Sequence, residues 1–142
     1  MKILLTCCVI CLPLKQLRLT SAYGYRVHPV TGKYAFHAGV DLRAHADTVF
    51  AVMDGEANTV AYDNLLGLHI TLQHAIVSSV YGHLSQVFVS PGERVSAGEP
   101  IGITGYTGRV TGEHLHFSIR YGTLYINPLT FLYQALIQQN HE

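Results

Sequence analysis

Short hydrophobic runs alternate with turn residues along most of the chain. These runs are Thr48 to Val52, Glu56 to Tyr62, Leu68 to His74, Ile76 to Tyr81, Pro100 to Thr104 and His114 to Tyr121. Dipeptides containing glycine or asparagine separate several of them, as at Asp54-Gly55 and Ala97-Gly98. Short alternating segments bounded by such residues are typical of antiparallel β-strands. The pattern therefore predicts an all-β domain, a compact antiparallel sandwich or barrel-like structure.

Only the end of the chain has a helical pattern. Leu129, Leu132 and Leu136 recur at helical spacing, and Pro128 stands where a helix starts well. We therefore predict a short C-terminal helix. No long linker, charge run or low-complexity segment divides residues 14–142, which predicts a single domain.

The first 13 residues differ from the rest. Lys2 precedes an apolar stretch from Ile3 to Leu12, which Thr6 interrupts and Pro13 closes. This pattern predicts a secretory signal or hydrophobic leader, and hence export to the periplasm, the cell envelope or the outside of the cell. The alternative is a first strand or core segment, because the small residues of a cleavage site are missing. All three cysteines lie in this segment, so no disulfide framework is expected in the remainder.

The charge composition narrows the possible partners. Nine Lys and Arg balance nine Asp and Glu, and these four types make up 13% of the 142 residues. A neutral chain lacks the field that draws proteins to nucleic acid or anionic lipid, so neither partner is expected. No apolar run approaches the length of a transmembrane span. Nine histidines, as many as Lys and Arg together, provide nitrogen ligands that are neutral near pH 7.

Three histidine-containing clusters carry the candidate chemistry, at residues 37–41, 81–85 and 113–117. Side chains alternate along a strand, so His114 and His116 should project together while Leu115 and Phe117 face the core. If His37 and Asp41 share a strand, their separation of four places them on one face, as a helix also would. Two imidazoles and one carboxylate, with water as the fourth ligand, are usual for catalytic zinc.

A zinc hydrolase also needs a side chain that moves protons at the bound water and the tetrahedral intermediate. His83 could fill this role, together with whichever of His114 and His116 does not bind the metal. No His-Glu-x-x-His motif occurs in the sequence, which excludes the helical zincin arrangement.

The order His37-x-x-x-Asp41, Gly82-His83-Leu84-Ser85 and His114-Leu115-His116 resembles the lysostaphin/LytM-type zinc metallopeptidases. The similarity extends from about Leu14 to Leu132. It includes the segment from Ser21 to Pro29, the turns between Pro91 and Gly98, the loop Gly105-Tyr106-Thr107-Gly108 and Asn127-Pro128 before the helix.

The resemblance implies a fold of the duplicated hybrid motif type and a zinc-dependent endopeptidase that hydrolyses cross-links or stem peptides of bacterial peptidoglycan. It implies that His37, Asp41 and His116 hold Zn²⁺. It further implies that His83 and His114 contact the water and the developing oxyanion, without deciding which of the two is the base.

Two other classes of function compete with this interpretation. Some relatives are non-catalytic modules that bind or activate other cell-wall hydrolases, but such proteins lack members of the His/Asp set, and this chain has all five. A biotinyl or lipoyl carrier, which the turns of residues 91–102 resemble, needs an exposed lysine on a hairpin. The only lysines of the chain are Lys2, Lys15 and Lys33, and none of them lies near these turns, so a carrier function is excluded.

Many relatives carry a long segment ahead of the catalytic domain, whereas about a dozen residues precede the resemblance here. We therefore expect either a bare catalytic module that depends on a targeting or activating protein partner, or a truncated gene start.

Overall fold

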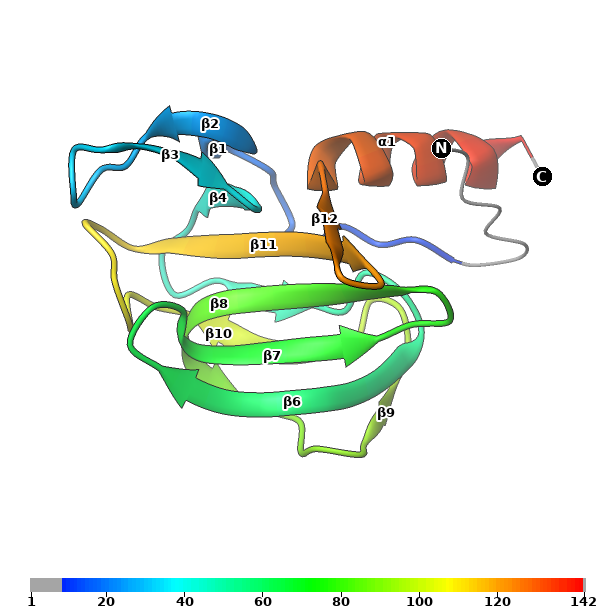
Figure 1. Cartoon of the computed structure of the whole chain (residues 1–142). Coiled ribbons are helices and arrows are strands. Elements are labelled where there is room, and N and C mark those ends of the chain that lie inside the picture. Colours follow the sequence, from blue (N-terminus) through cyan, green and yellow to red (C-terminus); the bar gives the residue numbers. More distant parts are fainter. Residues whose placement is uncertain (1–8, 142) are drawn as a thin grey trace.

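Antiparallel β-strands dominate the computed structural model, which describes residues 9–141 (Figure 1). The elements are β1 (Leu19–Ser21), β2 (Gly24–Val27), β3 (Tyr34–His37), β4 (Val40–Arg43), β5 (Thr48–Phe50), β6 (Gly55–Asp63), β7 (Gly67–Gln73), β8 (Val77–Val87), β9 (Arg94–Val95), β10 (Pro100–Thr104), β11 (His114–Tyr121), β12 (Leu124–Ile126) and α1 (Pro128–Asn140). The predicted all-β fold with a short C-terminal helix is confirmed.

One ten-stranded sheet contains almost all the strands. Its main path runs β1-β4-β11-β8-β7-β6-β9, while β10 pairs with β5 and β8, and β12 pairs with β11. Strands β2 and β3 form a separate two-stranded ribbon, seen in blue and cyan in Figure 1. Strands β4, β11 and β8 are therefore consecutive neighbours in the path, although 70 residues of chain lie between β4 and β11.

Side chains along β11 alternate between the hydrophobic core and the candidate site. Leu115, Phe117 and Ile119 are fully buried, whereas His114 and His116 are only partly buried. The expectation that Leu115 and Phe117 face the core while the two histidines project together is confirmed. The strand thus carries both a hydrophobic face and a polar face.

Strand β8 changes partner in its middle. Its first part pairs with β11 as far as Gly82, and its last part pairs with β10 from Leu84 onward. Between them, His83 has a φ of 61°, in the left-handed region that few non-glycine residues adopt. Its backbone N–H leaves the ladder and donates to the Leu66 carbonyl at 2.7 Å. This bulge explains why β8 continues to Val87, six residues beyond the predicted end.

Helix α1 begins where the sequence predicts. The Asn127 side chain caps it by accepting hydrogen bonds from the backbone N–H groups of Leu129 and Thr130, and Pro128 occupies the first turn. Phe131 and Leu132 are buried against the sheet. The helix therefore closes one end of the core.

The described part of the predicted leader, residues 9–13, packs on the domain. Ile10 is 5% exposed and belongs to the core, and its N–H donates to Gln139 of α1 at 2.6 Å. The Cys11 N–H donates to the Val52 carbonyl. Residues 1–8, with Cys7 and Cys8, lie outside the described residues, so cleavage of a signal and the domain boundary at residue 14 stay predictions.

Among the helices of residues 9–141, none has the length and apolar character needed to cross a membrane.

Candidate metal centre

The structure brings the five candidate residues together from four strands. His37 ends β3, Asp41 lies on β4, His83 on β8, and His114 and His116 on β11. All five line one cavity of about 370 Å³. Its rim includes Arg26 and His28 from the β2–β3 ribbon and Arg109 from the loop before β11.

His37 and Asp41 do not share one strand. They lie on β3 and β4, which belong to different sheets, and Ala38-Gly39 turns the chain between them. A side chain at Gly39 would lie 2.5 Å from the Ser118 hydroxyl and 2.6 Å from the Phe117 carbonyl, so only glycine fits there. The two side chains still meet because this tight turn folds β3 back over the site.

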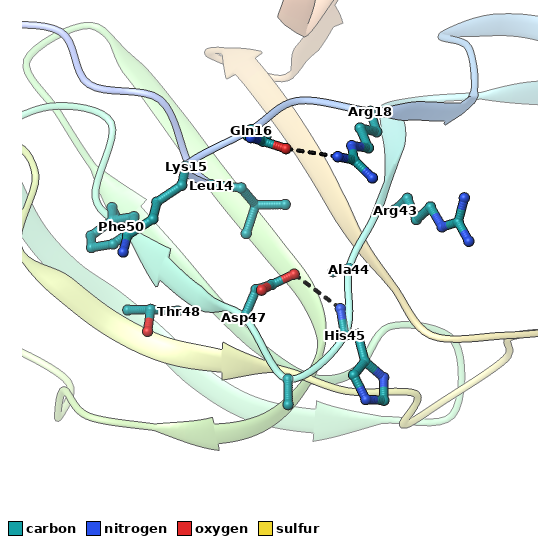
Figure 2. A pocket seen from close by; sticks show the side chains of 11 residues that line it. Leu14, Lys15, Gln16, Arg18, Arg43, Ala44, His45, Asp47, Thr48 and Phe50 are labelled. Carbon is teal, nitrogen blue, oxygen red and sulfur yellow. Dashed lines mark hydrogen bonds between the residues drawn. The ribbon is translucent and has the colours of Figure 1, made fainter.

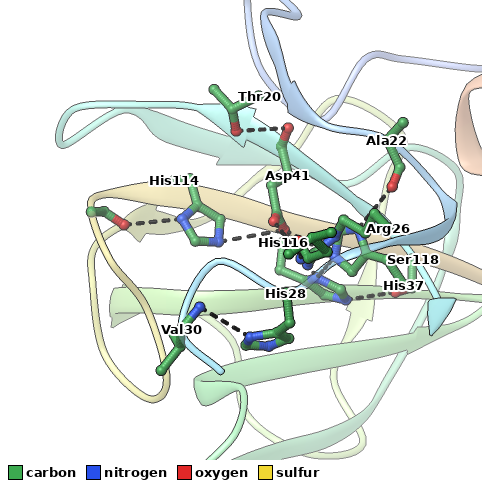
Figure 3. A network of polar contacts seen from close by, with 12 residues as sticks. Thr20, Ala22, Arg26, His28, Val30, His37, Asp41, His114, His116 and Ser118 are labelled. Atoms are coloured by element: carbon green, nitrogen blue, oxygen red, sulfur yellow. Dashed lines mark hydrogen bonds and ion pairs between the residues drawn. The ribbon is translucent and has the colours of Figure 1, made fainter. Parts of the chain in front are cut away.

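Three donor atoms form a nearly equilateral triangle at the centre (Figure 3). The His37 Nε2 to Asp41 Oδ1 distance is 3.3 Å, His37 Nε2 to His116 Nδ1 is 3.3 Å, and His116 Nδ1 to Asp41 Oδ1 is 3.2 Å. Tetrahedral zinc with ligand bonds of about 2.0–2.1 Å separates its ligand atoms by about 3.3 Å. The donor set and its spacing therefore fit a zinc ion.

The remaining ring nitrogens of these two histidines are held by the protein. His37 Nδ1 lies 3.0 Å from the Ala22 carbonyl, which can only accept, so this nitrogen carries the proton and leaves Nε2 with a lone pair. His116 Nε2 lies 2.9 Å from the Ser118 hydroxyl. Partners of this kind orient imidazoles that bind metals.

The site favours deprotonated ligands. Burial opposes ionisation of Asp41, but its close contacts with the imidazoles of His114, His116 and His37 outweigh burial and hold the pKa of Asp41 far below its usual range. Burial also lowers the pKa of His116, against the opposing effect of Asp41. A carboxylate and neutral imidazoles are the forms that bind zinc.

His83 and His114 form a second pair beside the triangle, with ring centroids 4.8 Å apart. Each Nδ1 is fixed on a backbone carbonyl, at 2.7 Å from Thr107 for His83 and 3.0 Å from Gly112 for His114. Each ring therefore keeps Nε2 for the cavity, and His114 Nε2 lies 3.4 Å from Asp41 Oδ1.

The two rings differ in protonation. Burial lowers the pKa of His83 to about 4, so this ring is neutral near pH 7. Burial also acts to lower the pKa of His114, but its hydrogen bond to Asp41 and the carboxylate charge outweigh burial and raise it. Rings with opposite shifts are suited to different steps of proton transfer.

Sequence reasoning missed two contributors to the site. Arg26 approaches Asp41, with a guanidinium nitrogen 3.8 Å from Oδ2, and Ser118 supports His116. The signal for Ser118 was present, since it continues the alternation of His114 and His116 along β11. Arg26 gave no local signal, because only the folding of the β2–β3 ribbon over the site brings it to Asp41.

Comparison with known sequences gives a consistent result. The sequence model of peptidase family M23 matches residues 35–128. The chain is 37% identical over 121 residues to the peptidoglycan DD-endopeptidase ShyC of Vibrio cholerae, covering 83% of this chain and 28% of the relative. It is also 37% identical over 120 residues to the DD-carboxypeptidase/endopeptidase Mpg of Neisseria meningitidis, with coverage of 83% and 28%. The chain thus spans little more than a quarter of the length of these relatives.

Solved structures share the fold. A zinc-containing peptidase from Vibrio cholerae superposes with a TM-score of 0.76 and 30% identity, over 81% of this chain and 37% of that one. The catalytic domain of lysostaphin from Staphylococcus simulans gives a TM-score of 0.75 and 29% identity, over 82% of this chain and 92% of that one.

Proposed function

Since the chain belongs to peptidase family M23, we propose that it is a zinc-dependent endopeptidase that hydrolyses stem peptides or cross-links of bacterial peptidoglycan. The observation that carries this proposal is the triangle of His37 Nε2, Asp41 Oδ1 and His116 Nδ1, with edges of 3.2 to 3.3 Å. The names of the relatives, which are peptidoglycan DD-endopeptidases, support the substrate class.

In this proposal His37, Asp41 and His116 hold one zinc ion. Zinc bound by three side chains lowers the pKa of a coordinated water and polarises a substrate carbonyl. The hydrogen bonds to Ala22 and Ser118 keep the two imidazoles in the orientation that directs their lone pairs inward.

His83 and His114 would move protons and stabilise charge at the reacting carbonyl. Their Nδ1 atoms donate to Thr107 and Gly112, so each ring presents only Nε2 to a substrate in the cavity. A neutral Nε2 accepts a proton, and a protonated one donates to an oxyanion or a departing amine.

Such an enzyme would work in the cell envelope or outside the cell, where its substrate lies. The apolar character of residues 3–12 supports export. Targeting or activation by a protein partner is part of the proposal.

Digestion of purified peptidoglycan tests the proposal. The zinc-loaded protein should release soluble fragments, and mass analysis of products from two chemically different peptidoglycans should identify the bond cut. His114→Ala should retain zinc and release almost no fragments, whereas the matched control His141→Ala, on an exposed residue at the end of α1, should behave as wild type. Full activity of His114→Ala would refute its role. A zinc-loaded wild type that binds peptidoglycan without releasing fragments would favour the non-catalytic module.

A further inference from the structure

A second cavity, of about 510 Å³, lies outside the metal centre and is lined by three basic side chains (Figure 2). Arg18 and Arg43 lie at one end of this pocket, and Lys15 lies at the other end beside Phe50. These three are a third of the nine Lys and Arg residues of a chain with no net charge. The pocket is therefore a local concentration of positive charge.

The three basic groups have no acidic partner in the described part of the chain. Within residues 9–141, no ion pair involves any of the three, and Arg18 only donates to the Gln16 side chain, at 2.9 Å. One acidic residue, Asp47, lines the pocket, and its carboxylate accepts from the His45 backbone N–H at 3.0 Å. The guanidinium groups are thus available to an external anion.

Strand pairing connects the pocket to the metal centre. The Arg43 N–H donates to the Arg18 carbonyl at 2.7 Å, which holds the two arginines together. Arg43 is the second residue after Asp41 on β4 and pairs with His114 on β11. Side chains two apart on a strand leave the same face, about 7 Å apart. Arg43, at one end of the basic pocket, therefore leaves β4 on the face that carries Asp41 and pairs with His114.

We propose that Arg18, Arg43 and Lys15 form a subsite that binds a carboxylate of a peptide substrate while a neighbouring peptide bond lies at the metal centre. This inference rests on the proposed function. Peptidoglycan stem peptides carry free carboxylates on their acidic residues, and a guanidinium group binds a carboxylate through two parallel hydrogen bonds. A carboxylate bound at Arg43 would fix the register of the peptide relative to Asp41 and His114.

Binding tests the subsite directly. The probe is a synthetic stem peptide containing γ-linked D-glutamate, compared with the same peptide with every carboxyl amidated and with inorganic phosphate. Nuclear magnetic resonance of the arginine Nε–H groups of the zinc-loaded protein reports where each probe binds. We expect the carboxylate peptide to shift the signals of Arg18 and Arg43. We also expect it to bind about tenfold more tightly than the amide, the scale of one charge-assisted hydrogen bond.

Variants identify the residues responsible. The double variant Arg18→Gln/Arg43→Gln should weaken binding of the carboxylate peptide about tenfold. The matched control Arg94→Gln changes an exposed arginine on β9 and should bind as wild type. Equal affinity of the double variant, equal affinity for the amidated peptide, or equal shifts with phosphate at the same concentration would each overturn the carboxylate subsite.

Cleavage of the same peptides separates this inference from the proposed function. In the double variant, KM for the carboxylate substrate should rise about tenfold with kcat within about twofold, because a uniform binding interaction is lost. Cleavage with an unchanged KM overturns the subsite and leaves the peptidase. Binding that depends on Arg18 and Arg43 without any cleavage supports the subsite and contradicts the peptidase.

Discussion

Two groups of buried histidines differ in the partners of their ring nitrogens. In the first, His74 Nδ1 lies 2.8 Å from the Asp54 carbonyl and Nε2 lies 2.8 Å from the Ser79 hydroxyl. Ser79 in turn lies 2.9 Å from the Tyr81 hydroxyl, which accepts from the Val52 N–H at 3.1 Å. We call this row the His74 network, and every polar atom in it has a partner within the protein.

The ring nitrogens at the metal centre have a different set of partners. Its histidines also have one ring nitrogen bonded to the protein, but the other nitrogens converge on one another and on a single carboxylate oxygen, Asp41 Oδ1. A cation bound between these atoms would attract the carboxylate oxygen and the nitrogen lone pairs alike. Both ring nitrogens of His74 have partners within the protein, as in a structural histidine, whereas the nitrogens that converge on Asp41 form a candidate metal site.

The largest effect is expected at the metal centre. Asp41→Asn should lower the bound zinc from about one per chain to a small fraction and abolish peptidoglycan hydrolysis, because a neutral amide is a poorer zinc ligand than a carboxylate. The unfolding free energy of the metal-free protein should also fall near pH 7, because the lowered pKa of Asp41 means that the folded chain stabilises its carboxylate. Metal analysis after dialysis and urea denaturation measure both. Full zinc retention would contradict the ligand assignment.

His83→Asn separates catalysis from metal binding. Asparagine tolerates the left-handed backbone that His83 adopts at φ 61°, so the bulge in β8 should persist without the imidazole. We expect kcat to fall by about 10² to 10⁴, the usual contribution of a general acid or base, with zinc content unchanged. Unchanged kcat would remove His83 from the mechanism, and lost zinc would make it part of the ligand set.

His74→Ala should show the opposite pattern. Removing this buried ring leaves Ser79 and the Asp54 carbonyl without their partner and opens a cavity, which should lower the unfolding free energy by about 2–3 kcal/mol. Zinc content and peptidoglycan hydrolysis at 25 °C should equal those of wild type. A loss of zinc in this variant would show that the two groups of histidines are not independent.

Tyr81→Phe should have a smaller effect of the same kind. The Val52 N–H and the Ser79 hydroxyl would lose one hydrogen-bond partner without loss of ring packing. We expect the unfolding free energy to fall by about 1–2 kcal/mol. A stability equal to that of wild type would show that water replaces the phenol oxygen in the buried row.

The smallest effect is a pH dependence of the His74 network. Burial lowers the pKa of His74, so in the window below about 6.5 the unfolded chain binds more protons than the folded one. Wild type should therefore lose stability as the pH falls below about 6.5, by at most about 1.4 kcal/mol per pH unit from this group. His74→Ala lacks this titration, so the stability difference between wild type and His74→Ala should narrow on acidification. A constant difference between pH 7 and pH 5 would contradict the shift.

The sequence predicted those features of the fold that depend on local alternation. The strand at residues 114–121 and the helix after Pro128 appear where the pattern of side chains indicates. Strand β8 was predicted to end at Tyr81, because the Gly82-His83 step does not continue the hydrophobic alternation. Its continuation depends on the exchange of β11 for β10 as partner, which no local pattern records.

The candidate site likewise combines features that a local pattern predicts with features that depend on tertiary contacts. The His-x-His pattern indicated two imidazoles on one face of a strand, and the structure has that arrangement. The placement of His37 and Asp41 on different strands, and the approach of Arg26 to Asp41, depend on the tight turn at Gly39 and on the β2–β3 ribbon. The basic pocket likewise joins Arg18 to Arg43 across 25 residues of chain through strand pairing.

Anomalous X-ray diffraction at the zinc absorption edge tests the central claim most directly. Crystals of the zinc-loaded protein should show one strong peak within about 2.0–2.2 Å of His37 Nε2, Asp41 Oδ1 and His116 Nδ1. No peak should appear at His74, whose ring nitrogens are both bonded within the protein. A peak bound by other side chains, or none in zinc-saturated crystals, would contradict the account.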